Sequence, residues 1–183
     1  MSVRPVVPRL RSAAAALAVA ALALAACDTT APPADPCAGL VPDVQPRIEW
    51  GEGVDGVRVG DTEADVLATL GEPDLRPWID LHKTGRTFLW RSGPLAGLMV
   101  VPLHRPDGTE TVGLFFLEAP YSGRTAAGIG LGSTRTAVEC AYGLTDTTGG
   151  AWSRFDAGGI AHYFAFRADT VSTLALYDTA YFE

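Results

Sequence analysis

The chain has 183 residues, which is enough for one domain or two small ones. Apolar residues make up 48% of it, so we expect a globular core and exclude disorder along the whole chain. Its 14 Lys and Arg residues against 21 Asp and Glu give a formal net charge of −7, which argues against nucleic-acid binding.

The N-terminus has the charge and hydropathy pattern of an export signal. Arg4, Arg9 and Arg11 precede an unbroken run of Ala, Leu and Val over residues 13–26. This run is shorter than the roughly 20 residues that a helix needs to cross a bilayer, and it fits the apolar middle of a secretory signal. Residues 1–26 are therefore predicted to be a signal peptide.

The signal ends in Leu-Ala-Ala-Cys at residues 24–27, which resembles the lipobox of bacterial lipoproteins. In such proteins the Cys is lipidated and becomes the first residue of the mature chain. We therefore expect Cys27 to anchor the protein to the cell membrane, facing the periplasm or the cell exterior. The alternative is ordinary cleavage after Ala26, although Leu24 fits the A-x-A preference of the general signal peptidase poorly. Residues 27–46 contain five prolines and are predicted to form an extended tether.

The rest of the chain contains two copies of one sequence pattern, separated by 72 residues. Each copy predicts a short helix whose N-cap is Asp61 or Ser133, and a Thr-x-x-Asp pattern in the first copy matches a capping box. Each helix is expected to end at a glycine that permits a left-handed C-cap. The identical pairs are Gly56/Gly128, Gly60/Gly132, Thr62/Thr134, Val66/Val138 and Gly71/Gly143.

Strand-like stretches follow each predicted helix in the same order. They cover residues 87–91, 95–103 and 111–118 in the first copy and residues 151–156, 160–167 and 170–178 in the second. Turn residues between the later stretches predict antiparallel meanders. The sequence therefore predicts an α+β fold made of two tandem helix-plus-antiparallel-meander units, one over residues 47–120 and one over residues 121–183.

The stretch from Val57 to Pro73 resembles the SmpA/OmlA (BamE-like) family of lipoproteins. Members of that family carry a Gly-Met-Thr turn, a Val-containing helix and a Leu-Gly-x-Pro ending. Here Gly-Asp-Thr at residues 60–62 stands in the place of the turn, and Leu-Gly-Glu-Pro at residues 70–73 forms the ending. Two such units in tandem look like the fold of the β-lactamase inhibitor protein. The resemblance implies protein–protein interaction in the cell envelope rather than catalysis.

Lipidation of Cys27 leaves Cys37 and Cys140, and an even number in an oxidising compartment permits one disulfide. Cys140 is two residues from the core-facing Val138, about 200° around the predicted helix, so it faces away from the core. The tether that carries Cys37 would cover it, and we predict a Cys37–Cys140 disulfide. The alternative is a free buried thiol at Cys140 and an incidental Cys37.

The sequence shows none of the common catalytic or metal-binding patterns. His82, His104 and His162 lie in separate segments without the spacing of metal ligands. The glycine-rich turn over residues 128–133 opens a helix, but no Lys follows it as in a phosphate-binding loop. We therefore expect no catalytic residues, no metal and no cofactor.

Alternation along the last strand of the first copy indicates a second apolar surface. If Phe115 and Leu117 face the helices, then Val112, Leu114 and Phe116 face the other way. An antiparallel sheet usually leaves that side to water. Such a face is buried either by the rest of the chain or by a partner.

Two Trp residues are further candidates for contacts with a partner. Trp78 lies in an insertion over residues 74–86 that the second copy lacks, and Trp90 follows it. Aromatic residues near loops are common anchors of protein interfaces. The alternative is that Trp78 fills an open end of the core.

These observations predict a membrane-anchored, non-catalytic module of the cell envelope that binds a protein partner through this sheet face and the 74–86 loop. The alternative function is that of a small-ligand-binding protein or an enzyme with a pocket between the repeats. A third hypothesis is a structural role in outer-membrane assembly.

Overall fold

The structure is a computed structural model that describes residues 35, 37–78, 86–105, 107–143 and 152–181. The chain divides into two units, Met1–Asp35 and Pro36–Glu183, and every helix and strand given below belongs to the second. The predicted signal peptide and the predicted lipidation site at Cys27 lie outside the described residues. Of the helices that are described, none has the length and apolar character needed to span a bilayer.

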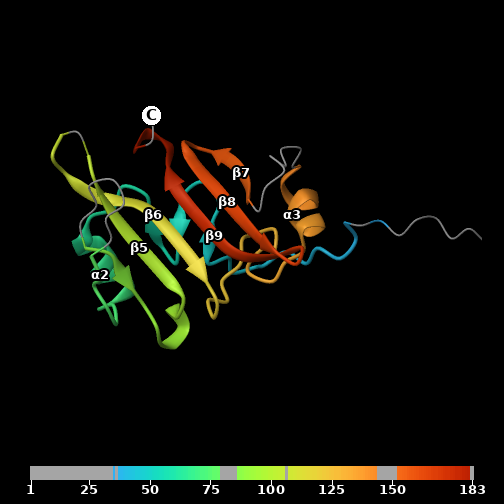
Figure 1. The fold of residues 1–183 in the computed structure, drawn as a ribbon, viewed down its shortest axis with the longest axis horizontal. Helices are drawn as coiled ribbons and strands as arrows, with labels where there is room; N and C mark the ends of the chain where they lie inside the picture. Colours follow the sequence, from blue (N-terminus) through green and yellow to red (C-terminus); the bar gives the residue numbers. More distant parts are fainter. Residues whose placement is uncertain (1–34, 36, 79–85, 106, 144–151, 182–183) are drawn as a thin grey trace, which may run out of the picture. The chain divides into compact units, whose positions relative to one another are not determined.

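Two antiparallel sheets hold most of the regular secondary structure described in the second unit (Figure 1). The small sheet has the order β1-β2-β3, and the large sheet has the order β4-β5-β6-β9-β8-β7. The strands of the small sheet are β1 (Ile48–Glu49), β2 (Gly53–Val54) and β3 (Val57–Arg58). The strands of the large sheet are β4 (Phe88–Leu89), β5 (Leu98–His104), β6 (Glu110–Glu118), β7 (Trp152–Ala157), β8 (Ile160–Arg167) and β9 (Thr170–Asp178).

Two α-helices of eight residues each, α2 (Glu63–Leu70) and α3 (Arg135–Tyr142), begin at threonine N-caps. The N-cap of α2 is Thr62, which forms the capping box with Asp65, and the N-cap of α3 is Thr134. The predicted N-caps, Asp61 and Ser133, were therefore wrong by one residue. Their side chains instead accept backbone N–H groups three residues upstream, at 2.7 Å and 3.1 Å, and so close the turn before each helix. Two 3₁₀ turns, η1 (Gly93–Leu95) and η2 (Thr179–Tyr181), complete the elements.

The predicted α+β fold of two tandem helix-plus-meander units is wrong, because the described unit is mostly antiparallel β-sheet. Strands β6 and β9 pair directly, from Leu114↔Tyr177 to Glu118↔Thr173, so strands from both halves of the chain form one sheet. Each α-helix completely buries a single side chain, which is too little to build a separate core around it. The small sheet was not predicted, since strands of two residues give no alternation signal.

Within this shared sheet, the two copies of the sequence pattern make the same backbone contacts. The Gly60 N–H donates to the Val112 carbonyl of β6 at 2.7 Å, and the Val112 N–H donates to the Asp61 carbonyl at 2.8 Å. The residues 72 positions further on make the same two bonds with Val171 of β9, at 2.8 Å and 2.9 Å. Each pair of bonds ties the turn before a helix to one of the two central strands.

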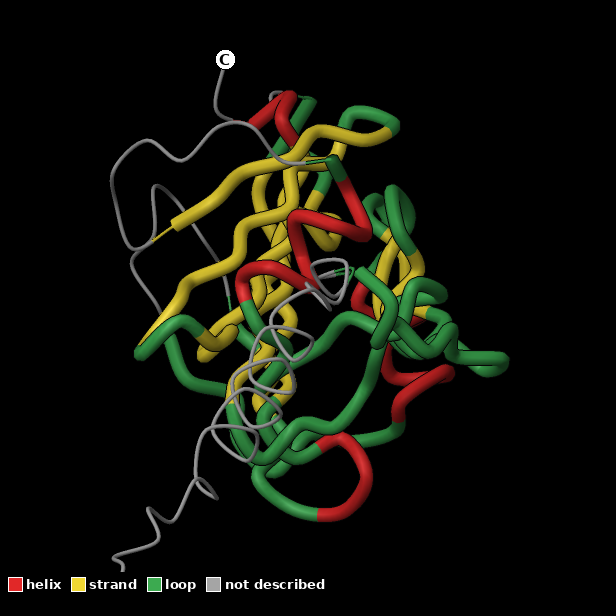
Figure 2. Tube along the Cα trace, turned by 90° about the vertical axis from the view of Figure 1, so that its right-hand side faces the viewer, coloured by secondary structure: helices red, strands yellow, loops and turns green. Residues whose placement is uncertain are grey.

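The main core lies between one face of the large sheet and the layer formed by the small sheet and the α-helices. Figure 2 shows that layer on one side of the large sheet. The large side chains that are completely buried come from both sheets and from the segment before α3. They include Ile48, Phe88, Phe115, Ile129, Phe164 and Leu174.

Candidate interaction surface

The opposite face of the large sheet carries a second apolar cluster, which we call the outer face. It contains four buried and five partly buried side chains, contributed by strands β5, β6, β8 and β9 and by η2. The buried members are Val101, Leu103, Leu114 and Ala175, and the partly buried members are Met99, Phe116, Tyr163, Tyr177 and Tyr181. Side chains that alternate along each strand thus supply both the main core and this face.

Strand register brings the aromatic members of the outer face together. Ala175 of β9 lies between Phe116 of β6 and Tyr163 of β8, so a small residue separates two large ones across the sheet. The rings of Tyr163 and Tyr177 stack with centroids 5.1 Å apart, and their hydroxyl oxygens are 2.8 Å apart. Burial and this hydrogen bond raise the pKa of Tyr177 to about 12, so its hydroxyl is uncharged at neutral pH.

A recess of about 330 Å³ adjoins the outer face where β4, β5 and β6 meet. Leu89, Met99 and Phe116 contribute apolar walls, and Arg91 and Glu118 line it with opposite charges. An apolar recess with a charged lining can accept one side chain of a bound protein.

Charged and polar groups lie near other parts of the outer face. Arg154 of β7 pairs with Asp156 at 3.0 Å, and its guanidinium carbon is 5.8 Å from the ring centroid of Tyr163. Near η2, the Tyr181 hydroxyl donates to the Leu103 carbonyl at 2.8 Å. An apolar centre with charged neighbours is the usual arrangement of a protein interface.

The structure agrees with the prediction for Leu114 and Phe116 but not for Val112, which is completely buried in the main core. The reason is a β-bulge, because Val101 of β5 pairs with Leu114 while Pro102 pairs with Val112. Gly113 is the extra residue of β6, and it moves Val112 to the core face.

The two Trp candidates differ in their exposure to solvent. Trp90 is 4% exposed and belongs to the main core, so its prediction as a partner anchor is wrong. Its place next to β4 puts it on the same face as the buried Phe88. Trp78 is 70% exposed, which contradicts the alternative that it fills the core. The middle of the predicted 74–86 loop, residues 79–85, lies outside the described residues.

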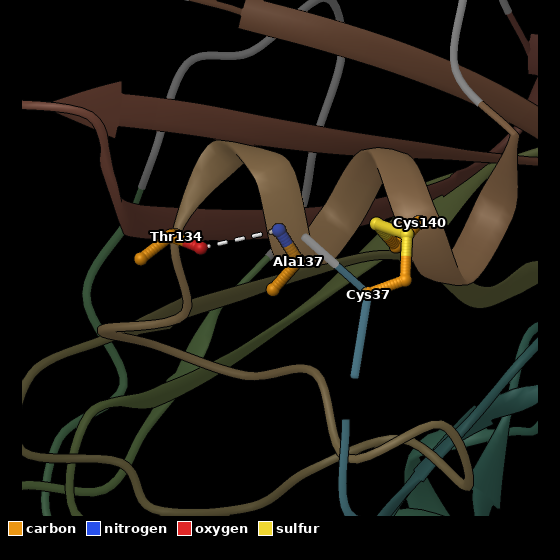
Figure 3. Close-up of a disulfide and its surroundings, with 4 residues drawn as sticks. All are labelled: Cys37, Thr134, Ala137 and Cys140. Atoms are coloured by element: carbon orange, nitrogen blue, oxygen red, sulfur yellow. Dashed lines mark hydrogen bonds between the residues drawn. A yellow bond between two sulfur atoms is a disulfide. The ribbon is translucent and has the colours of Figure 1, made fainter. Parts of the chain in front are cut away.

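Cys37 and Cys140 form a disulfide, the pair predicted from the position of Cys140 on its helix. Their Cα atoms are 5.5 Å apart. Figure 3 shows the bond beside α3, six residues beyond the N-cap Thr134, whose hydroxyl accepts the Ala137 N–H. The segment after Cys37 is held against the same unit, since the Asp43 N–H donates to the Ala126 carbonyl at 3.2 Å.

Sequence reasoning missed a stack of one buried and two partly buried rings that joins the small sheet to the large one. Trp50 lies between Tyr142 of α3, at 3.9 Å between centroids, and His162 of β8, at 3.7 Å. His162 Nε2 accepts the Gly51 N–H at 3.1 Å, and burial lowers the pKa of His162 to about 4. This His is therefore neutral and structural. The signal that could have found it is the alternation of β8, which places position 162 on the same face as Phe164.

A second missed network fixes the small sheet to the loop after β6. The Tyr121 hydroxyl donates to Asp55 at 2.7 Å, and Arg47 donates to the same carboxylate at 3.0 Å. The Arg47 guanidinium also lies over the Tyr121 ring, 4.9 Å from its centroid. Burial, followed by the bond to Asp55, raises the pKa of Tyr121, so this hydroxyl acts as a hydrogen-bond donor.

Another recess, with a volume of about 580 Å³, lies between the small sheet and the ends of β8 and β9. Its charged groups bind each other, Arg58 to Glu52 at 3.0 Å and Arg105 to Asp178 at 3.2 Å. Within the described ranges, no group of three or more His, Cys, Asp or Glu side chains is placed to hold a metal ion.

No family model matches the chain, and no curated protein matches it. A solved DUF4309 family protein, YjgB from Bacillus subtilis, is 18% identical with a TM-score of 0.46, over 70% of this chain and 88% of that one. An extracellular protein containing an SCP domain from Bacillus anthracis is 10% identical with a TM-score of 0.38, over 66% of this chain. The chain spans 44% of the length of that second protein. Likeness at this level assigns neither a family nor an activity.

Proposed function

We propose that this chain is an extracytoplasmic lipoprotein that binds another protein of the cell envelope on the outer face of its large sheet. The observation that carries the proposal is the group of partly buried Met99, Phe116, Tyr163 and Tyr177 on one face, while the small sheet and the α-helices pack on the other. Aromatic residues and Met are enriched in the centres of protein interfaces.

The location outside the cytoplasm is supported by two independent features. Residues 1–27 have the charge, hydropathy and Cys position of a lipoprotein signal. The disulfide between Cys37 and Cys140 persists in an oxidising compartment and is rare in the cytosol. The resemblance of residues 57–73 to the SmpA/OmlA lipoproteins agrees with a binding role in the envelope.

The recess next to Phe116 gives the interaction a defined anchor point. We expect the partner to insert one apolar side chain between Leu89, Met99 and Phe116, because burial in a preformed recess concentrates binding energy in a few residues. The neighbouring Tyr pair offers hydroxyl groups at the edge of this contact.

Photocrosslinking in the intact envelope tests the proposal. A photoreactive amino acid replaces Phe116 in the full chain, and a matched control replaces Thr136, which is exposed on α3. We expect one protein to crosslink from position 116 and not from position 136, and the yield to fall when Tyr163→Asp is added. Equal labelling from both positions, or no crosslink from position 116, would overturn the outer face as the binding surface.

A further inference from the structure

Strand β7 ends the large sheet, and its six residues pair with β8 from Trp152↔Ala165 to Ala157↔Ile160. In an edge strand, alternate residues direct their N–H and C=O groups away from the sheet. Those groups can bind another strand, which makes such an edge a place for strand addition.

The outer-face residues of β7 carry opposite charges. Arg154 and Asp156 are two residues apart, with side chains 48% and 56% exposed, and Arg154 Nε is 3.0 Å from the Asp156 carboxylate. Because side chains two apart on a strand share a face, both charges lie on the outer side of the edge.

We propose that β7 pairs antiparallel with β7 of a second copy of this chain, around a two-fold axis at residue 155. Arg154 then lies opposite Asp156 of the second copy, and Asp156 lies opposite Arg154 of the second copy. The two six-stranded sheets become one continuous sheet. Two Arg154–Asp156 pairs between the copies are then added to the one such pair within each strand.

The charges also select this register over its neighbours. A slip by two residues places either Arg154 opposite Arg154 or Asp156 opposite Asp156 across the axis, and opposed like charges destabilise paired strands. A slip by one residue places outer-face positions opposite core-face positions. The pairing around residue 155 is the register in which every outer-face charge of β7 meets its opposite.

The dimer extends the outer face across the axis. Arg154 lies opposite Tyr163 within the sheet, so the charged strip between the two copies lies directly beside both Tyr pairs. The proposal does not depend on what the outer face binds, because it rests on the edge of β7 and its charges.

Charge reversal tests the pairing. The full chain is extracted from the envelope in detergent, and the mass of its protein part is measured by light scattering over a range of concentrations. We expect a dimer for the wild type, and dissociation constants about tenfold higher for Arg154→Asp and for Asp156→Arg. The double variant, Arg154→Asp with Asp156→Arg, restores opposite charges in the same register and is expected to recover the wild-type constant.

Arg167→Asp serves as the matched control, because Arg167 is exposed at the end of β8 and lies outside β7. We expect it to leave the dimer intact. A monomeric wild type, a complex with a different protein at this edge, or a double variant as weak as the single ones would overturn the proposal. Loss of the crosslink from position 116 with the dimer retained contradicts only the proposed function.

Discussion

At the scale of single residues, His162 shows how a titratable group becomes part of a core. Its ring stacks on Trp50, and its Nε2 accepts the Gly51 N–H, so the neutral form satisfies a backbone donor. Protonation would replace this acceptor with a second donor and place a charge in the apolar layer between the two sheets. The scattered positions of the His residues in the sequence argued against a metal cluster but carried no information about this packing.

The stability of the fold is therefore expected to depend on pH through His162. Its pKa is about 4 in the folded chain, against an ordinary value of 6.5. Between these values the unfolded chain binds a proton at this position and the folded chain does not, so the free energy of unfolding falls as the pH drops from 6.5 to 4. The loss amounts to about 3 kcal/mol.

Urea unfolding at a series of pH values measures this loss. The control is His162→Gln, which keeps an acceptor for the Gly51 N–H but does not titrate. The difference between the two proteins is expected to change only within this pH window. A difference that stays constant from pH 7 to pH 4 would show that the His is not buried in its neutral form.

Two glycines of the second sequence copy allow the effect of backbone strain on stability to be compared with the effect of close packing. Gly128 and Gly132 have φ angles of 78° and 80°, a region that favours glycine. A Cβ at residue 132 meets nothing within 4 Å, whereas a Cβ at residue 128 would collide with the Val41 carbonyl oxygen. We expect Gly132→Ala to cost about 1 kcal/mol in the free energy of unfolding and Gly128→Ala to cost about 1–3 kcal/mol more. Thermal unfolding of both variants checks this order, and equal losses would show that Val41 does not approach the turn.

At the scale of elements, the sequence is most informative where apolar alternation is long. The predicted stretches over residues 160–167 and 170–178 coincide with β8 and β9. Core-facing side chains recur every second residue over 160–164 and 174–176, and a register shift interrupts this alternation between them. The small sheet was missed because its strands have two residues each. The bulge at Gly113 was missed as well. Because one extra residue reverses the face of the side chains beyond it, Val112 was predicted on the wrong face.

The candidate site, too, was predictable only where it depends on alternation within one strand. Leu114 and Phe116 were placed on the outer face by alternation alone, but Tyr163 and Tyr177 join them only through the pairing of β6, β9 and β8. Strand order is set by contacts between distant segments, and local sequence patterns do not reveal it. The same limit explains why the prediction kept the two halves as separate units.

At the scale of the whole described unit, residues 37–43 contact residues 126–140, which lie far along the chain. The Cys37–Cys140 bond, the Asp43–Ala126 hydrogen bond and the approach of Val41 to Gly128 hold the segment before the small sheet against α3 and the turn before it. Residues predicted to be tether are thus part of the folded unit from Cys37 onward. The disulfide is the covalent member of this set.

Removal of the disulfide is expected to lower the free energy of unfolding by about 3–5 kcal/mol. The two cysteines are separated by 103 residues, and a loop of this length restricts the unfolded chain strongly. Urea unfolding with and without reductant measures the effect, and the double variant Cys37→Ser, Cys140→Ser is the control that reductant leaves unchanged. If reduction leaves the wild-type midpoint where it was, the bond does not constrain the unfolded chain. If the reduced wild type and the double Ser variant unfold at the same urea concentration, the loss belongs to the cross-link itself and not to the replaced side chains.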